Sequence, residues 1–111
     1  MWYGISLLFE NCHVGEPADH NLWEERILLV EASSDAAAAQ MGKRLGKAEE
    51  HEYTSATGDR IQCRFRRVDS VHTIDAALET GTEVFSRFLR ANEVASLRTP
   101  FKQEKAVGKS G

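Results

Sequence analysis

Charged side chains at strand-like positions are the first candidates for chemistry in this 111-residue sequence. They alternate with apolar residues in several segments, so they could converge on one surface of a sheet. Two carboxylates in a cleft could act as a general acid and a general base. Glutamates opposite arginines on neighbouring strands could instead form cross-strand ion pairs, which is the commoner arrangement. The candidate binding residues are Glu24, Glu25, Arg26, Arg64, Arg66, Glu83 and Arg87, and none is assigned a catalytic role.

A metal site would have to draw on Cys12, His13 and His20, with His51 or His72 completing the ligand set. Zinc sites favour tight ligand pairs such as C-x2-C or H-x3-5-H, because each pair closes a small ring around a tetrahedral ion. The adjacent Cys12 and His13, with His20 further along, do not fit this spacing. We therefore expect no metal and no other cofactor.

The two cysteines are the candidate nucleophiles. A cysteine nucleophile needs a histidine as base and a third group to orient that histidine. Cys63 is expected to face inward as a small apolar residue, and no local signature supports Cys12. The two residues are far apart and outside any CxxC pattern, so reduced thiols in a cytoplasmic protein are the expected state.

The sequence separates its charges. Residues 1–35 contain seven acids and one base, whereas residues 60–67 contain four arginines and no acid. An acidic and a basic strand could pair within the chain, or a bipolar surface could bind a partner or a second copy. RNA binding through the arginines would require exposed aromatic residues beside them, which are expected on a separate face. With a net charge of −3, neither nucleic acid nor a membrane is an expected partner.

Period-two alternation indicates the strands that would position these residues. Strands are expected over 2–10, 22–32, 53–57, 60–68 and 82–90, with a hairpin turn at Gly58 and a bulge or bend near Asp69. An alanine-rich helix is expected from residue 35 to about residue 50, capped by Ser33, Ser34 or Asp35. Its apolar stripe would comprise Ala38, Met41, Leu45 and Ala48, with Gly42 and Gly46 allowing a close approach to the sheet. A single helical turn is expected at 75–79.

These elements predict an α+β fold of about five mostly antiparallel strands with one main helix on one face, in the order β-β-α-β-β-β. Residues 1–92 would form a single domain and residues 93–111 a flexible tail. One helix cannot cover five strands, so the remaining apolar surface is expected to find a partner, most simply in a homodimer. The predicted core comprises Tyr3, Ile5, Leu7, Phe9, Ile27, Leu29, Met41, Leu45, Ile61, Phe65, Val84 and Phe88.

Composition indicates an ordinary globular protein, with 41% hydrophobic and 28% charged residues. The opening apolar stretch has no basic leader, and no run approaches the roughly 20 apolar residues of a membrane span. We therefore expect a soluble protein of the cytoplasm.

Several segments together resemble one protein family. They are WYGISLLFE at the start, LWEERILLVEA in the second strand, the Gly58 turn, Phe65 to Val68, and GTEVFSRFL near residue 85. In this order they are similar to the bacterial family called domain of unknown function 4288, over roughly residues 2–90. The most specific part is Gly81 to Phe88, and Cys63 departs from the larger aromatic residue expected in the family. The resemblance implies a bacterial protein, supports the predicted fold order and assigns no catalytic residue.

The function expected from the sequence is that of a small non-enzymatic protein-interaction module, acting as a homodimer or on an unknown protein partner. The alternative is a small-ligand binder, or a minor enzyme, that uses glutamate and arginine side chains in a cleft.

Overall fold

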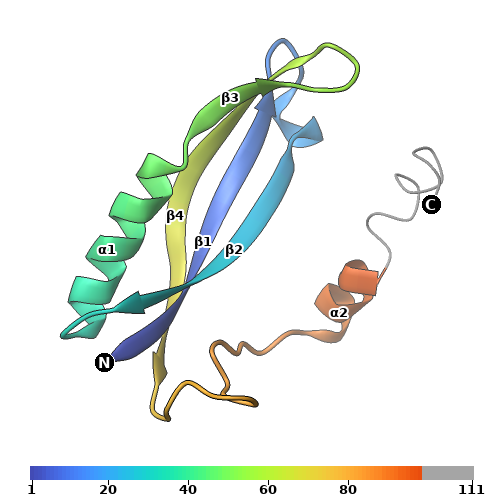
Figure 1. Ribbon diagram of the computed structural model, residues 1–111. Helices are drawn as coiled ribbons and strands as arrows, with labels where there is room; N and C mark the ends of the chain where they lie inside the picture. The colour runs from blue at the N-terminus through green and yellow to red at the C-terminus, as the bar shows by residue number, and fades with distance from the viewer. Residues whose placement is uncertain (99–111) are drawn as a thin grey trace.

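The computed structural model describes residues 1–98 and shows one antiparallel sheet with a long helix on one face (Figure 1). The strands are β1 (Trp2–His13), β2 (Leu22–Glu31), β3 (His51–Thr54) and β4 (Arg60–Ile74). A 3-10 turn (Ala18–His20) precedes β2, and the helices are α1 (Asp35–Ala48) and α2 (Ala91–Arg98). The spatial order of the strands is β2-β1-β4-β3. The predicted α+β class, with a main helix on an antiparallel sheet, is confirmed.

The central strand β1 carries the core. Its residues alternate between the two faces of the sheet, and Ile5, Leu7 and Phe9 lie beneath α1 with no exposed surface. The opposite face of β1 presents Gly4, Ser6, Leu8 and Glu10. Because β1 pairs with β2 on one side and β4 on the other, every backbone amide along it can be satisfied within the sheet.

The long strand β4 bends where its register against β1 slips. Ser6 pairs with Ser70 but Leu7 pairs with Val68, which leaves Asp69 as an extra residue. A second slip leaves Arg66 without a directly opposed residue on β1. The bulge predicted near Asp69 is therefore confirmed, and two bulges give β4 the curvature that lets it follow α1.

Helix α1 begins where Ser34 caps it, since the Ser34 hydroxyl oxygen accepts a hydrogen bond from the amide of Ala37 at 3.1 Å. Its buried face consists of Ala38, Gly42 and Gly46. A side chain at position 46 would overlap the ring of Phe65, so the predicted close approach of the helix to the sheet is confirmed. Leu45, predicted to be in the core, is more than one-third exposed because the helix contacts the sheet through its small residues instead.

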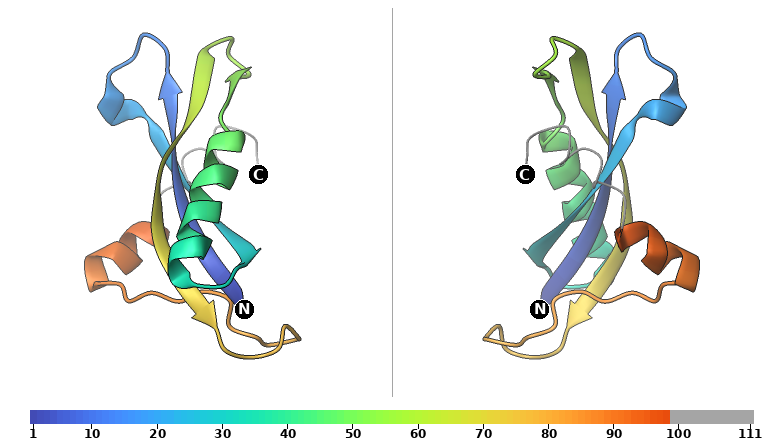
Figure 2. Two further views of the ribbon diagram at one scale, coloured as in Figure 1. Left: turned by 90° about the vertical axis from the view of Figure 1, so that its left-hand side faces the viewer. Right: turned by 90° about the vertical axis from the view of Figure 1, so that its right-hand side faces the viewer.

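The predicted fifth strand at 82–90 does not form, and neither does the predicted helical turn at 75–79. After β4 the chain turns at Gly81 and crosses the face of the sheet that α1 leaves uncovered (Figure 2). The crossing occurs at Gly4, where any side chain would collide with the carbonyl oxygen of Val84. The side chains of the segment do alternate, but the segment lies across a sheet face and not along a sheet edge.

The predicted core is correct for β1 and wrong for the uncovered face. Tyr3 and Ile61 are buried as expected, whereas Ile27, Leu29, Val84 and Phe88 are exposed. In β2 the residues beneath α1 are Leu28 and Val30. Both faces of β2 are apolar, so its pattern alone could not show which face would be covered.

The predicted domain boundary at residue 92 falls inside α2, a helix that the sequence analysis did not include. Most of the predicted flexible tail, residues 99–111, lies outside the described residues. Neither helix in residues 1–98 is long and apolar enough to cross a membrane.

Candidate functional site

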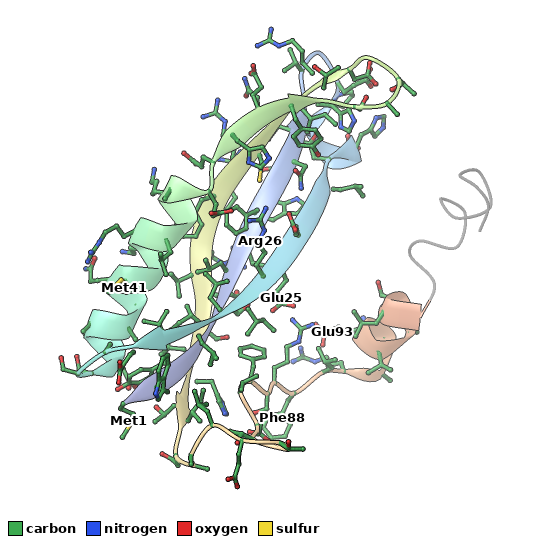
Figure 3. The ribbon with its side chains drawn as sticks, in the orientation of Figure 1. Met1, Glu25, Arg26, Met41, Phe88 and Glu93 are labelled. Atoms are coloured by element: carbon green, nitrogen blue, oxygen red, sulfur yellow. The ribbon has the colours of Figure 1, made fainter. Side chains whose placement is uncertain are left out.

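The sheet divides the seven candidate charged residues between its two faces. From their alternation along β2, Glu24 and Arg26 lie on the face with α1, and Glu25 lies on the opposite face (Figure 3). We call this second face, which α1 leaves uncovered, the open face. It also carries Arg64 and Arg66 of β4, and it is contacted by Glu83 and Arg87 of the crossing segment. The seven residues therefore do not form one cleft.

On the open face, Glu25 binds the crossing segment to the sheet. The Ser6 hydroxyl donates a hydrogen bond to Glu25 Oε2 at 2.6 Å, and Arg87 Nη1 lies 2.9 Å from Glu25 Oε1. Ser6 is completely buried, and the hydrogen bond to this carboxylate satisfies its hydroxyl group. The predicted residues Glu25 and Arg87 are thus brought together, in a structural contact between β2 and the crossing segment.

A second contact holds the same segment over β4. His72 Nε2 lies 3.2 Å from Glu83 Oε2, and the Phe85 ring packs edge-on against the His72 ring with centroids 6.3 Å apart. Side chains at 83, 85 and 87 therefore face the sheet, while those at 84 and 88 face away. This arrangement is the reverse of the orientation expected for Val84 and Phe88.

Further along the open face lies a buried carboxylate that is not among the seven candidate residues. Glu10 is only 9% exposed, and its oxygens accept hydrogen bonds from Asn21 Nδ2 at 2.8 Å and from Arg66 Nε at 2.9 Å. The hydrogen bond from Asn21, followed by the contribution of Arg66, lowers the pKa of Glu10 despite its burial. The sequence signal for this site is a glutamate that directly follows the apolar run of β1, but the sequence does not indicate which residues bind it.

Arg64 and Arg66, predicted as neighbours, differ in role. Arg66 also approaches the Cys12 sulfur, with Nη2 and Sγ 3.7 Å apart, whereas Arg64 donates to the Gln62 side chain at 2.9 Å. The chain of contacts continues from Gln62 to Glu52, and the hydrogen bond from Gln62, ahead of Arg60, lowers the pKa of Glu52. These groups form a polar ladder across β4 and β3.

On the face with α1, the Arg26 side chain covers one end of the core. Its guanidinium lies 4.4 Å from the centre of the Phe9 ring and pairs with Glu24 at 3.2 Å and with Glu49 at 2.9 Å. The Glu24 carboxylate raises the pKa of Arg26. Glu24 and Arg26 are therefore brought together, and they fasten β2 to the end of α1.

One hollow lies on the α1 side of the sheet, and another lies at the β3 edge. One of about 230 Å³ lies between β2 and α1, is lined by Leu7, Phe9, Leu28 and Leu45, and ends at the Arg26–Glu49 pair. The other, of about 370 Å³, is shallow and runs from Glu50 along β3 past Cys63. Burial raises the pKa of the Cys63 thiol, which keeps it protonated as an apolar side chain.

The candidate metal ligands lie apart from one another. His20 approaches Glu16, His51 contacts the carbonyl of Glu49, and His72 faces Glu83. Within residues 1–98, no three histidine, cysteine or acidic side chains gather closely enough to hold an ion.

The apolar side chains of β2 are the remaining feature of the open face. Trp23, Ile27 and Leu29 point to this side from alternate positions and are 50%, 44% and 47% exposed. They form one row along the strand, which we call the β2 apolar row. Ile27 and Leu29 were predicted to lie in the core, so their exposure on this face is a correction.

Comparison with known proteins supports the resemblance seen in the sequence. Searches of curated proteins and of solved structures found no match. A family model described as "Domain of unknown function (DUF4288)" matches residues 2–86, which span β1 to the segment that crosses the open face. The chain belongs to the DUF4288 family.

Proposed function

We propose that the protein is a non-enzymatic protein-interaction module that acts as a homodimer through the open face of its sheet. The observation that carries this proposal is the β2 apolar row. Three large side chains in one line, each about half exposed, leave apolar surface whose burial contributes about 25 cal/mol per Å². The opposite face of the same sheet is covered by α1, so the open face is the one that gains from a partner.

The partner is a second copy, because the chain itself has exposed apolar side chains that could cover the open face of another copy. Residues 82–98, which we call the arm, present Phe88, Val94 and Leu97 to solvent. The Phe88 side chain is fully exposed (Figure 3). Two copies can bury both surfaces at once, and a two-fold contact uses each surface twice.

The charged residues support a binding role over acid–base chemistry. Glu25, Glu83 and Arg87 fix the arm, and Arg66 neutralises the buried Glu10. Glu24 and Arg26 join β2 to α1, and Arg64 supports the ladder through Gln62. Each of the seven predicted residues thus has a partner within the chain that accounts for its position.

A cytoplasmic location in a bacterium is part of the same proposal. Cys12 and Cys63 are free thiols on opposite faces of the sheet, a state that suits a reducing compartment.

The test is sedimentation velocity over a range of protein concentrations. We expect a dimer for the wild type at tens of micromolar, and a monomer for the Trp23→Ser, Leu29→Ser double variant. The matched control is Val14→Ser with Leu78→Ser, which removes similarly exposed apolar side chains that lie outside the four strands. A wild-type protein that sediments as a monomer at every concentration would contradict the proposal.

A second candidate function is the binding of a small apolar ligand, favoured by the hollow between β2 and α1. Its lining is apolar and its rim carries the paired Arg26, which suits an apolar body with a polar head. Fluorescence titration with a short-chain fatty acid tests it. Saturable binding that Leu45→Trp abolishes would support this function, and no change in signal up to millimolar ligand would exclude it for this class.

A further inference from the structure

The edge of the sheet formed by β2 has backbone hydrogen-bonding groups that no other strand of residues 1–98 pairs with. Met1 and Ala32 exchange both backbone hydrogen bonds, at 3.0 and 3.2 Å, which makes them a closely bonded antiparallel pair. Such pairs recur at every second residue, so Val30, Leu28, Arg26, Glu24 and Leu22 direct their backbone groups toward β1. The amides and carbonyls of Trp23, Glu25, Ile27, Leu29 and Glu31 consequently point away from the sheet.

The same odd-numbered residues of β2 carry the β2 apolar row. Each of Trp23, Ile27 and Leu29 therefore offers two things at one position: backbone groups at the sheet edge and an exposed apolar side chain on the open face. Natural edge strands are usually short, or are protected by charged side chains, especially lysine, or by proline. This strand is ten residues long and contains neither lysine nor proline, and its charges are confined to Glu24, Glu25, Arg26 and Glu31. It has the properties of a strand that pairs with another chain.

The arm extends over this edge. It crosses the open face from β4 to Glu25 of β2, and α2 then stands apart from the sheet on the side opposite α1 (Figures 1 and 2). Helix α2 packs against no other helix or strand of residues 1–98. Isolated helices of about eight residues are marginal in water, so α2 needs a surface to pack on.

We propose that two copies pair antiparallel through their β2 edges, and that the arm of each copy packs on the open face of the other. This inference rests on the proposed function, and it specifies the contact through which the dimer forms. A two-fold axis perpendicular to the sheet keeps both open faces on the same side. An arm that leaves one copy over its β2 edge then continues directly onto the neighbouring open face, where the apolar row of the second copy lies.

Charge selects the register of the paired strands. Outward-pointing residues must face outward-pointing residues, so the two-fold axis passes through a residue position. Axes through Arg26 or Ile27 give the longest overlap, but an axis at Arg26 places two arginines directly opposite each other, which is destabilising. An axis at Ile27 pairs Ile27 with itself and Glu25 with Leu29 of the second copy. It also pairs Trp23 with Glu31 of the second copy, and it opposes no like charges.

The first test places a lysine at each edge of the sheet in turn. Ile27→Lys puts a charge at the centre of the proposed β2 contact, and Thr54→Lys puts one on β3, the opposite edge strand. We expect sedimentation velocity to show at least a hundredfold weaker dimer for Ile27→Lys and an unchanged dimer for Thr54→Lys. Circular dichroism checks that both variants are folded. A dimer that tolerates Ile27→Lys would overturn the β2 contact while leaving self-association itself intact.

The second test uses disulfide formation and does not depend on destabilising the dimer. In the proposed register, the Cα atoms at position 27 of the two copies are about 5.5 Å apart, within the range of a disulfide. The corresponding atoms at position 29 are separated by about 14 Å, since residue 29 faces residue 25 of the second copy and lies four residue steps from its own counterpart along the strand. We expect Ile27→Cys to form a covalent dimer on mild oxidation, and Leu29→Cys to give no more than the wild type, which controls for Cys12 and Cys63. Equal cross-linking of both variants would overturn the register.

The arm is tested separately with Phe88→Ser and Leu97→Ser. Both side chains are exposed on a single copy, so the stability of the monomer should not change. We expect the double variant to weaken the dimer about tenfold or more, because it loses apolar contacts with the second copy. An unchanged dissociation constant would overturn the arm contact. A wild type that never dimerises would instead defeat the proposed function as a whole.

Discussion

The two faces of the sheet use the same strands in opposite ways. Beneath α1, β1 contributes Ile5, Leu7 and Phe9, which are completely enclosed, and the helix meets them through glycine and alanine. On the open face, β1 contributes Gly4, Ser6 and Glu10. Ser6 and Glu10 bind polar side chains of β2 and β4, and the irregular crossing segment passes over Gly4. One face is closed by packing and the other is closed only in part, by ion pairs and hydrogen bonds.

This difference indicates where stability and where binding reside. A tightly packed face contributes to folding through buried area and cannot also accept a partner. The open face has buried polar groups that specify how the arm sits, and apolar groups on β2 that remain available. Substitutions on the two faces should therefore separate changes in folding from changes in association.

The largest loss of stability is expected on the covered face. Ile5→Ala removes a fully buried side chain under α1 and should lower the free energy of unfolding by about 2–5 kcal/mol. Ile5→Val, which removes one methylene, should cost only about 0.5–1.5 kcal/mol. Urea denaturation followed by circular dichroism measures both. Equal effects of the two variants would show that the site collapses around the missing atoms and is not rigidly packed.

A smaller loss is expected where α1 touches the sheet. Gly46→Ala raises helix propensity by about 1 kcal/mol, yet the added methyl group would overlap the Phe65 ring. Overpacking of this kind costs about 1–3 kcal/mol, so we expect a net loss of stability. Lys47→Ala, at the next and exposed helix position, should stay within about 0.5 kcal/mol. If Gly46→Ala were stabilising, the helix would have to lie further from β4.

On the open face, the buried Glu10 should make stability depend on pH. Its folded-state pKa lies below the ordinary value of 4.5, so its ionised form stabilises the folded state fully at neutral pH. This contribution is lost as the pH falls from about 4.5 through the lowered pKa. Glu10→Gln should therefore cost about 1–2 kcal/mol at pH 7, by the loss of charge-assisted hydrogen bonds, and less in acid.

Urea denaturation of Glu10→Gln at a series of pH values provides the measurement. The control is Glu31→Gln, which removes a charge from the exposed end of β2. A difference between wild type and Glu10→Gln that grew as the pH fell would contradict the assignment of Glu10 as an ionised partner of Asn21 and Arg66.

The sequence was sufficient for elements that depend on local chemistry. Alternation located β1, a serine cap located the start of α1, Gly58 located the hairpin and the broken pattern located the bulge at Asp69. Each of these signals lies within a few residues of the feature it predicts, so no knowledge of distant contacts was required.

The features that the sequence could not predict depend on contacts between distant segments. Residues 82–90 alternate as a strand would, but their position is decided by contacts with His72 and Glu25, which lie on strands earlier in the sequence. Glu10 and Arg66 are 56 residues apart, and a bulge in β4 brings them together. The candidate charged residues were therefore identified by type, while their pairing and their division between two faces required the structure.

The smallest effect is expected from a residue of β2 whose neighbour gives a much larger one. Leu28 and Leu29 are adjacent and identical in type, but Leu28 packs beneath α1 while Leu29 faces outward on the open face. Leu28→Ala should lower the free energy of unfolding by about 1–3 kcal/mol, since it removes partly buried side-chain atoms from the core. In dilute, monomeric protein, Leu29→Ala should change it by less than about 0.5 kcal/mol.

At high concentration Leu29→Ala should instead weaken self-association, whereas Leu28→Ala should leave the dissociation constant of the folded protein unchanged. Urea denaturation at low concentration and sedimentation velocity at high concentration measure the two quantities independently. The reverse pattern, with Leu29→Ala as the destabilising variant, would mean that β2 is rotated by one residue, which would exchange its covered and open faces.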